Sequence, residues 1–269
     1  MRKNDEADKP KLLTKGETAE RLGIGIDLSK LSDTRCLFVS NRALFYKDCL
    51  LEGNGKNISG CVFYKCTVSN KLVDSSVLLF DCTLLEQDSF SFNLQKANLR
   101  RDNLTGANLT GANLIGADLT LANLTSANLA SANLASAILY NANISGANLI
   151  DAQLTRTDLT GANLTHANLT NADLTNANLT STALYYADLT GANLIGAYFM
   201  DTGLEGSKFI EANLEGSKFL YAHCKGINFS GANLTNTAFV MTDLSGALYS
   251  DSTIGLSEER KSVMVRVDS

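Results

Sequence analysis

A large apolar residue recurs at every fifth position from Leu94 to Ile254, and this period constrains the fold more than any other feature of the chain. The run holds 33 consecutive matches, most of them Leu. Two positions before each match lies a small residue, usually Ala, as in the unit Ala107-Asn108-Leu109-Thr110-Gly111. A period of five matches neither the 3.6 residues of a helix nor the alternation of a strand. The pattern therefore predicts short units separated by turns, in a chain that coils on itself.

We call the large apolar residue of each unit position i. Positions i and i−2 are expected to face inward, and the other three positions to form outward faces or corners. Asn or Asp commonly occupies i−1, Thr or Ser occupies i+1, and a mixture rich in Gly occupies i+2. Asn and Gly accept the dihedral angles of turns at low cost. The pattern predicts inner columns of Leu and Ala beneath a polar surface.

This unit resembles the pentapeptide-repeat family, whose consensus is a small residue, Asn or Asp, Leu and two variable positions. The resemblance implies an all-β fold, a right-handed four-sided parallel β-helix (solenoid) with 20 residues per coil. A large aromatic residue at every tenth position from Phe199 to Tyr249 fits this geometry, because these residues would fall on two opposite walls of each coil. The repeat would form about eight coils, and thus a rod about 40 Å long at the usual spacing between strands.

The chain divides into four regions on this pattern. Residues 1–33 are polar and weakly helical, and are expected to form a tail or cap. Residues 34–93 hold irregular units with Cys at i−2, which predict degenerate coils with loops. Residues 94–254 predict the regular β-helix, and residues 255–269 a C-terminal cap or tail that begins with a short capped helix. Such C-terminal elements often mediate dimerisation in the family, so a homodimer is one expectation.

The sequence contains no catalytic constellation: no glycine-rich phosphate loop, no nucleophile elbow and no HExxH-type pair. Asp residues of the repeat replace Asn at i−1, where they would be spread over an outer surface rather than gathered in a dry pocket. Five of the six Cys residues fall at the small position i−2, which favours packing over a metal site or a disulfide. We expect no enzyme activity, no cofactor, no metal site and a reducing compartment.

Targeting signals are weak in this chain. No apolar run reaches the roughly 20 residues that cross a membrane, and the charged first residues lack the apolar core of a signal peptide. These features favour a cytoplasmic, bacterial protein. An effector delivered by a specialised secretion system stays open as a further alternative.

The outer surface is where the sequence predicts contact with a partner. Sorting the units at 20 residues per coil places a set of large apolar side chains in or beside one outward column. This candidate interaction surface consists of Tyr140, Tyr198, Met200, Leu220, Tyr221, Val240 and Met241. A contiguous exposed apolar stripe usually marks an interface. The alternative is that the tail after residue 255 folds back and covers the stripe.

Net charge bears on a second function known in the family, in which the rod imitates a DNA duplex and binds DNA gyrase or topoisomerase IV. Residues 94–254 carry twelve acidic and seven basic side chains, a net charge of −5 that equals the charge of the whole chain. DNA carries about one charge per 1.7 Å, or about 24 charges over a rod of this length. We therefore expect a protein-interaction scaffold, with a topoisomerase-binding DNA mimic of the quinolone-resistance type as the alternative, and no direct nucleic acid binding.

Overall fold

The structure is a computed structural model that describes residues 94–267 in full. Before residue 94 it describes only strand backbones and their pairing. The weak helix expected within residues 1–33 and the loops expected between the early units lie outside the described residues. The strands of this part are β1 (Leu12–Leu13), β2 (Arg35–Val39), β3 (Ala43–Lys47), β4 (Leu50–Leu51), β5 (Val62–Tyr64), β6 (Thr67–Ser69), β7 (Leu78–Phe80) and β8 (Thr83–Leu85).

The early strands follow the coil pattern only in part. Strands β3, β5 and β7 pair in parallel, and so do β4, β6 and β8. Leu51, Val68 and Leu84 are successive partners in the second ladder, so parallel stacking precedes residue 94 with a spacing shorter than 20 residues. By contrast, β2 pairs antiparallel with β1 and with β3. The unit expected at Phe38 therefore belongs to an antiparallel pair, with Leu44 as its partner.

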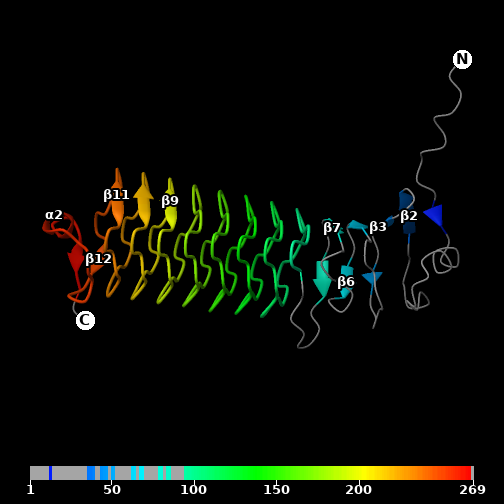
Figure 1. Ribbon diagram of the computed structural model, residues 1–269, viewed down its shortest axis with the longest axis horizontal. Helices are drawn as coiled ribbons and strands as arrows, with labels where there is room; N and C mark the ends of the chain where they lie inside the picture. The colour runs from blue at the N-terminus through cyan, green and yellow to red at the C-terminus, as the bar shows by residue number, and fades with distance from the viewer. Residues whose placement is uncertain are drawn as a thin grey trace, which may run out of the picture.

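From residue 94 the backbone repeats every 20 residues. Parallel bridges join position i−1 of one coil to position i−1 of the next, as from Asn98 to Asp118. Each coil has four such positions, and we call the column that each position forms from coil to coil a wall. Figure 1 shows the successive coils side by side along the rod. We number the walls by their first residue at position i: wall 1 begins at Leu94, wall 2 at Leu99, wall 3 at Leu104 and wall 4 at Leu109.

On wall 2 the bridges lengthen into short strands near the C-terminal end. These strands pair in parallel, with residues 20 positions apart in register. They are β9 (Tyr198–Met200), β10 (Lys218–Leu220) and β11 (Ala238–Val240). Strands β11 and β9 are the two edge strands of this sheet, and β9 also bridges to Asn178 of the preceding coil.

The interior consists of the predicted columns. From Leu94 to Leu234 the side chains at position i are buried, and so are the Ala side chains at i−2. Phe219 stacks between the Phe199 and Phe239 rings on wall 2, with centroid distances of 4.3 and 4.9 Å. It also meets Phe229 of wall 4 edge-on at 6.1 Å. Aromatic residues ten positions apart therefore alternate between two walls, as the sequence predicts.

Most corners of the rod are β-turns that begin at position i. The N–H of Ala97, for example, donates to the carbonyl of Leu94 at 3.0 Å. From Lys96 to Gly246, residue i+2 of each unit has a φ between +50° and +71°, whether it is Gly, Asn, Ser or a larger residue. A positive φ at the second central residue is the signature of a type II turn, and it favours Gly or Asn.

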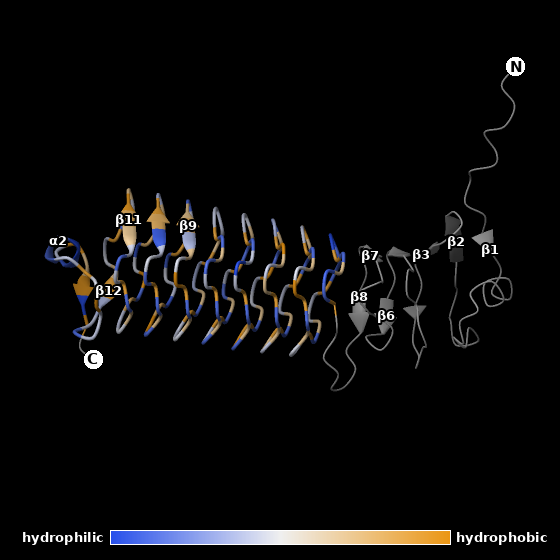
Figure 2. Cartoon of the chain, viewed as in Figure 1, coloured by the Kyte–Doolittle hydropathy of each residue, from blue (hydrophilic) through white to orange (hydrophobic). Residues whose placement is uncertain are grey.

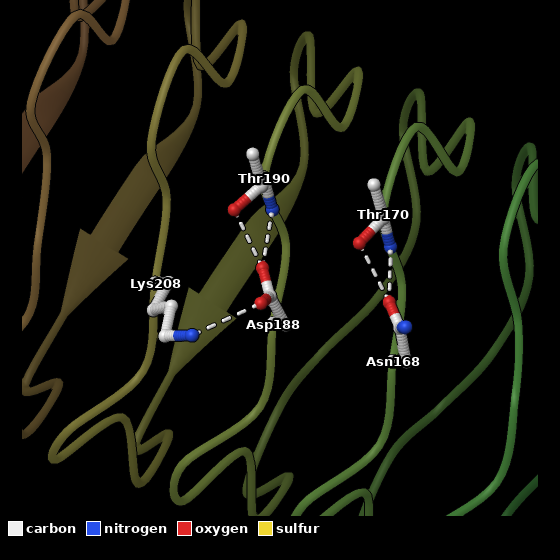
Figure 3. A network of polar contacts seen from close by, with 5 residues as sticks. All are labelled: Asn168, Thr170, Asp188, Thr190 and Lys208. Carbon is white, nitrogen blue, oxygen red and sulfur yellow. Dashed lines mark hydrogen bonds and ion pairs between the residues drawn. The ribbon is translucent and has the colours of Figure 1, made fainter.

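Side-chain clamps hold the outer face of many units (Figure 3). Asn168 Oδ1 accepts hydrogen bonds from the N–H and the hydroxyl of Thr170, at 3.0 and 2.6 Å. Asp188 accepts the same pair from Thr190, and Lys208 of the next coil donates to its other oxygen at 3.2 Å. Burial raises the pKa of Asp188, but the bonds from Thr190 and the charge of Lys208 outweigh it and hold that pKa below its usual value.

The regular repeat ends with a shift of one residue. Leu248 still pairs with a residue 20 positions earlier, but Ile254 pairs with Asn233, 21 positions earlier. Thr253 takes the buried inner position, and Ile254 is 53% exposed. The prediction that Ile254 is the last inward residue is therefore wrong. The reason is that the last turn starts one residue late, with Thr253 N–H donating to the Ser250 carbonyl at 3.0 Å.

The C-terminal residues pack against the end of the rod (Figure 1). The helix α2 (Glu258–Lys261) has Ser257 as its N-cap, and the Ser257 hydroxyl accepts from Arg260 N–H at 3.4 Å. This confirms the short capped helix. Strand β12 (Leu248–Tyr249) then pairs in parallel with β13 (Val265–Arg266), so the tail adds a strand at the end of wall 4. In the described part of the chain, no helix is long and apolar enough to cross a membrane.

Candidate interaction surface

Six of the seven predicted surface residues lie together on the last coils of wall 2. Leu220 on β10 is in register with Met200 on β9 and with Val240 on β11, so three apolar side chains form one column. Tyr198 lies on the same face of β9, on the other side of Phe199. Figure 2 shows hydrophobic residues gathered on these strands. We call Tyr198, Met200, Leu220, Tyr221, Val240 and Met241 the wall 2 cluster.

Two members of the cluster, Tyr221 and Met241, occupy corner positions. Tyr221 is 55% exposed and Met241 is 76% exposed. Their φ angles are +56° and +50°, in the left-handed region. For a residue with a Cβ this conformation costs about 1–2 kcal/mol. These two large apolar side chains therefore lie at corners of the rod, outside its core.

Tyr140 does not join the wall 2 cluster, because Thr160 and Thr180 stand between it and Met200 in the same column. Its neighbours are Leu121 and Ile138, which are exposed as Tyr140 is. The N–H of Leu121 donates to the Tyr140 carbonyl at 2.9 Å, so these residues lie on adjoining coils. Tyr140 thus belongs to a second, smaller apolar group.

The tail leaves the wall 2 cluster open. It reaches the column of Phe rings only at its end, where the Arg260 guanidinium lies 5.1 Å from the centroid of Phe239. A groove of about 650 Å³ lies beside this contact, between the last coil and the segment around α2. Its lining includes Phe239, Met241, Asp243, Leu244, Glu259 and Val263.

Polar groups of both signs surround the cluster. Lys218 is exposed on β10. Asp201, at the corner after β9, lies 4.0 Å from the Nε2 atom of His223 on wall 3. An apolar centre with a mixed polar rim is the usual anatomy of a protein–protein interface.

Wall 3 carries an aromatic group that the five-residue period does not predict. The rings of His166 and Tyr186 stack at 5.3 Å with an interplanar angle of 14°. The Tyr185 ring covers Gly203 so closely that a Cβ at Gly203 would overlap it. One feature of the sequence could have indicated this contact. Gly203 occupies an i−1 position that usually holds Asn, and it lies in the coil after Tyr185.

Residues 94–267 include one cysteine, and its side chain lies in the core. Cys224 is a free, buried thiol at position i. Burial, and then the carboxylates of Glu205 and Asp243, raise the pKa of this thiol far above its ordinary value, so it packs as an apolar side chain. Across residues 94–267, no three His, Cys, Asp or Glu side chains gather as a metal site would require.

A comparison with protein families identifies the class of the chain. The family model for pentapeptide repeats matches eight copies. The matched segments are residues 93–125, 103–139, 122–161, 157–196, 197–236 and 221–248. Together they cover more than half of the chain. The chain belongs to the pentapeptide-repeat family.

Solved structures of family members resemble the chain over most of its length. HetL, a pentapeptide-repeat protein involved in heterocyst differentiation regulation in the cyanobacterium Nostoc sp. strain PCC 7120, is 27% identical with a TM-score of 0.57. That match covers 86% of this chain and 95% of HetL. QnrB1, a plasmid-mediated fluoroquinolone resistance protein, is 17% identical with a TM-score of 0.50, over 82% of this chain and 96% of QnrB1. The search of curated proteins returned no match.

Proposed function

We propose that this protein is a non-enzymatic interaction scaffold, and that its rod presents the wall 2 cluster to a protein partner. The observation that carries the proposal is the exposure of Tyr221 and Met241 at left-handed corners, where the fold itself favours Gly or Asn. A position with a conformational cost and no packing role is well explained by a binding role. The partner is another protein or a second copy of this chain.

Two further features belong to this proposal. We take the rod to be a closed, right-handed, four-sided solenoid, as the family resemblance implies, with the C-terminal residues as its cap. We also propose a bacterial, cytoplasmic setting, which agrees with the unpaired buried thiol of Cys224. HetL takes part in a regulatory process, and a regulatory role through contact would suit a rigid rod of this kind.

The scaffold proposal can be tested by site-specific photocrosslinking in cells that produce the protein. A photoreactive amino acid replaces Leu220 in the cluster, or Ile195 at the equivalent i+1 position of wall 1 as a matched control. We expect a defined crosslinked protein from position 220 and none from position 195. Leu220→Glu should leave the fold intact and remove the crosslink from a photoreactive residue at 200. Equal crosslinking from both walls would contradict the proposal.

A second candidate function is that of a DNA-mimicking ligand of gyrase or topoisomerase IV. The fold likeness to QnrB1 motivates it. The net charge of −5 over the rod and the neutral Asn and Thr surface count against it. The test is inhibition of gyrase supercoiling by the purified protein, titrated to micromolar concentration. Potent inhibition that survives Leu220→Glu would favour this second candidate over the scaffold.

A further inference from the structure

The C-terminal end of the Phe column is covered only in part. Phe239 stacks on Phe219 on one side, at 4.9 Å, and meets the Arg260 guanidinium on another, at 5.1 Å. Beside this contact Phe239 and Leu244 line the groove, together with Met241 and Val263. Both Met241 and Val263 are exposed. The groove at the last coil therefore has an apolar side, formed by these four residues, within a lining that is otherwise polar.

Two carboxylates, those of Asp243 and Glu259, also line the groove. The N–H of Ser245 donates to Asp243 Oδ1 at 2.9 Å. This bond, then the Ser245 side chain, and then the charges of Lys225 and His223 hold the pKa of Asp243 below its usual value, so the group is ionised at neutral pH.

Neither carboxylate belongs to an ion pair within residues 94–267. Arg260, the basic side chain of the lining, lies over the ring of Phe239. The groove thus combines an apolar side with two exposed carboxylates that form no ion pair among the described residues.

We propose that this groove binds an amphipathic segment of a protein partner, with an apolar side chain over Phe239 and Leu244 and a Lys or Arg beside Asp243 and Glu259. This inference rests on the proposed scaffold function and names the chemistry of the partner. Met241 belongs both to the wall 2 cluster and to the groove, so one partner can cover both. An acidic segment would place its charges against the two carboxylates and is disfavoured.

The probe for this proposal is a set of short fluorescent peptides in a Gly-Ser context. The first peptide carries a Leu pair flanked by Lys, the second replaces Lys with Glu, and the third replaces Leu with Ser. Binding to the full chain is measured by fluorescence anisotropy at several salt concentrations. We expect saturable binding of the Lys–Leu peptide, and affinities about tenfold lower or worse for the other two. Equal affinity for the Lys and Glu peptides, or no binding, would overturn the proposal.

Variants of the chain locate the bound peptide. Met241→Glu should weaken binding of the Lys–Leu peptide about tenfold, because it places a charge at the apolar wall of the groove. Asp243→Asn combined with Glu259→Gln should weaken it by about twofold to fivefold and reduce its salt dependence. Leu121→Glu, at the same corner column far from the groove, is the matched control and should have no effect. An equal loss in the control would overturn the assignment.

The scaffold proposal and the groove proposal can fail separately. If position 220 still crosslinks to a partner while the peptides do not bind, the groove proposal falls and the scaffold proposal stands. If the peptides do not bind and Met241→Glu changes the sedimentation of the protein alone, the groove is occupied by a second copy, which also overturns the proposal.

Discussion

The two halves of the rod share one backbone but differ in what fills it and what covers it. Before about residue 195 the inner columns hold Leu and Ala, and Asn or Asp with Thr or Ser covers much of the outside. After it, Phe enters the core on two walls, and Tyr, Met and Val reach the surface of wall 2. In both halves a continuous ladder of backbone-to-backbone hydrogen bonds joins each coil to the next. Because the ladder does not depend on side chains, the repeat can change both its core and its surface while it keeps its geometry.

Wall 2 shows the change in successive coils. Asn178 Oδ1 accepts from the N–H and the hydroxyl of Thr180, and the Thr182 N–H closes the turn on the Leu179 carbonyl at 3.2 Å. One coil later Tyr198 and Met200 replace that clamp, and the backbone extends into β9. The surface of one end of the rod can therefore differ from the rest while the backbone repeat continues.

The largest effect is expected where an inner column is charged. Leu204 is fully buried, so Leu204→Lys would place an amine in a closed apolar column. We expect a loss of about 3–5 kcal/mol, enough to remove cooperative unfolding. Thermal unfolding followed by circular dichroism measures this. Asn176→Lys, at an exposed corner, is the control and should leave the melting curve unchanged. An unchanged curve for Leu204→Lys would contradict the inward position of i.

The two kinds of core can be compared by truncation. Phe219→Ala removes a ring that stacks on two others, and we expect a cost of about 3–5 kcal/mol. Leu139→Ala, on the same wall in the Leu-filled half, should cost about 2–4 kcal/mol. Denaturant unfolding of both variants gives the free energies of unfolding. A larger cost for Leu139→Ala would show that the Phe stack adds no stability beyond the Leu column.

We expect the large corner residue Tyr221 to lower the stability of the rod slightly and to strengthen binding of a partner. Tyr221→Gly removes a side chain from a left-handed residue, and we expect a gain of about 0.5–1 kcal/mol after the entropy cost of Gly. It should also weaken the crosslink or partner contact on wall 2. Ser181→Gly, at the same corner column among Thr residues, should stabilise the rod similarly and leave binding unchanged. A destabilised Tyr221→Gly protein would instead assign Tyr221 a structural role.

The smallest effect is a pH dependence of the outer clamps. The pKa of Asp188 is lowered in the folded rod. In the unfolded chain its pKa should be that of an ordinary Asp, about 3.9. Its contribution is therefore complete above that pH and is lost as the pH falls through the lowered folded value. Asp188→Asn should be slightly less stable than the parent at neutral pH, and the difference should shrink in acid. Lys208→Gln should weaken the same dependence. A stability difference that grows in acid would refute this role.

Much of the rod could be predicted because each unit repeats its environment. A residue at position i meets the same neighbours 20 positions away in every coil, so the period alone indicates that Leu109 or Leu204 faces inward. The alternation of Phe between two walls and the capped helix after Ser257 also follow from local spacing. The period also predicts that the wall 2 cluster lies together, because residues 20 positions apart, such as Met200, Leu220 and Val240, are neighbours on one wall.

The period does not predict the structure at the end of the rod, where a coil has a neighbour on one side only. Ile254 fits the period, but a turn that starts one residue late moves it outward. The contact of Arg260 with Phe239, and the groove beside it, join segments that no periodicity relates. Whether the tail covers Met241 depended on those same contacts, and it does not. Inside the rod, the environment of each residue is set by equivalent residues of the neighbouring coils, so the period predicts it. At the end of the rod, the environment is set by packing between segments that no period relates, so the spacing of residues in the sequence cannot predict it.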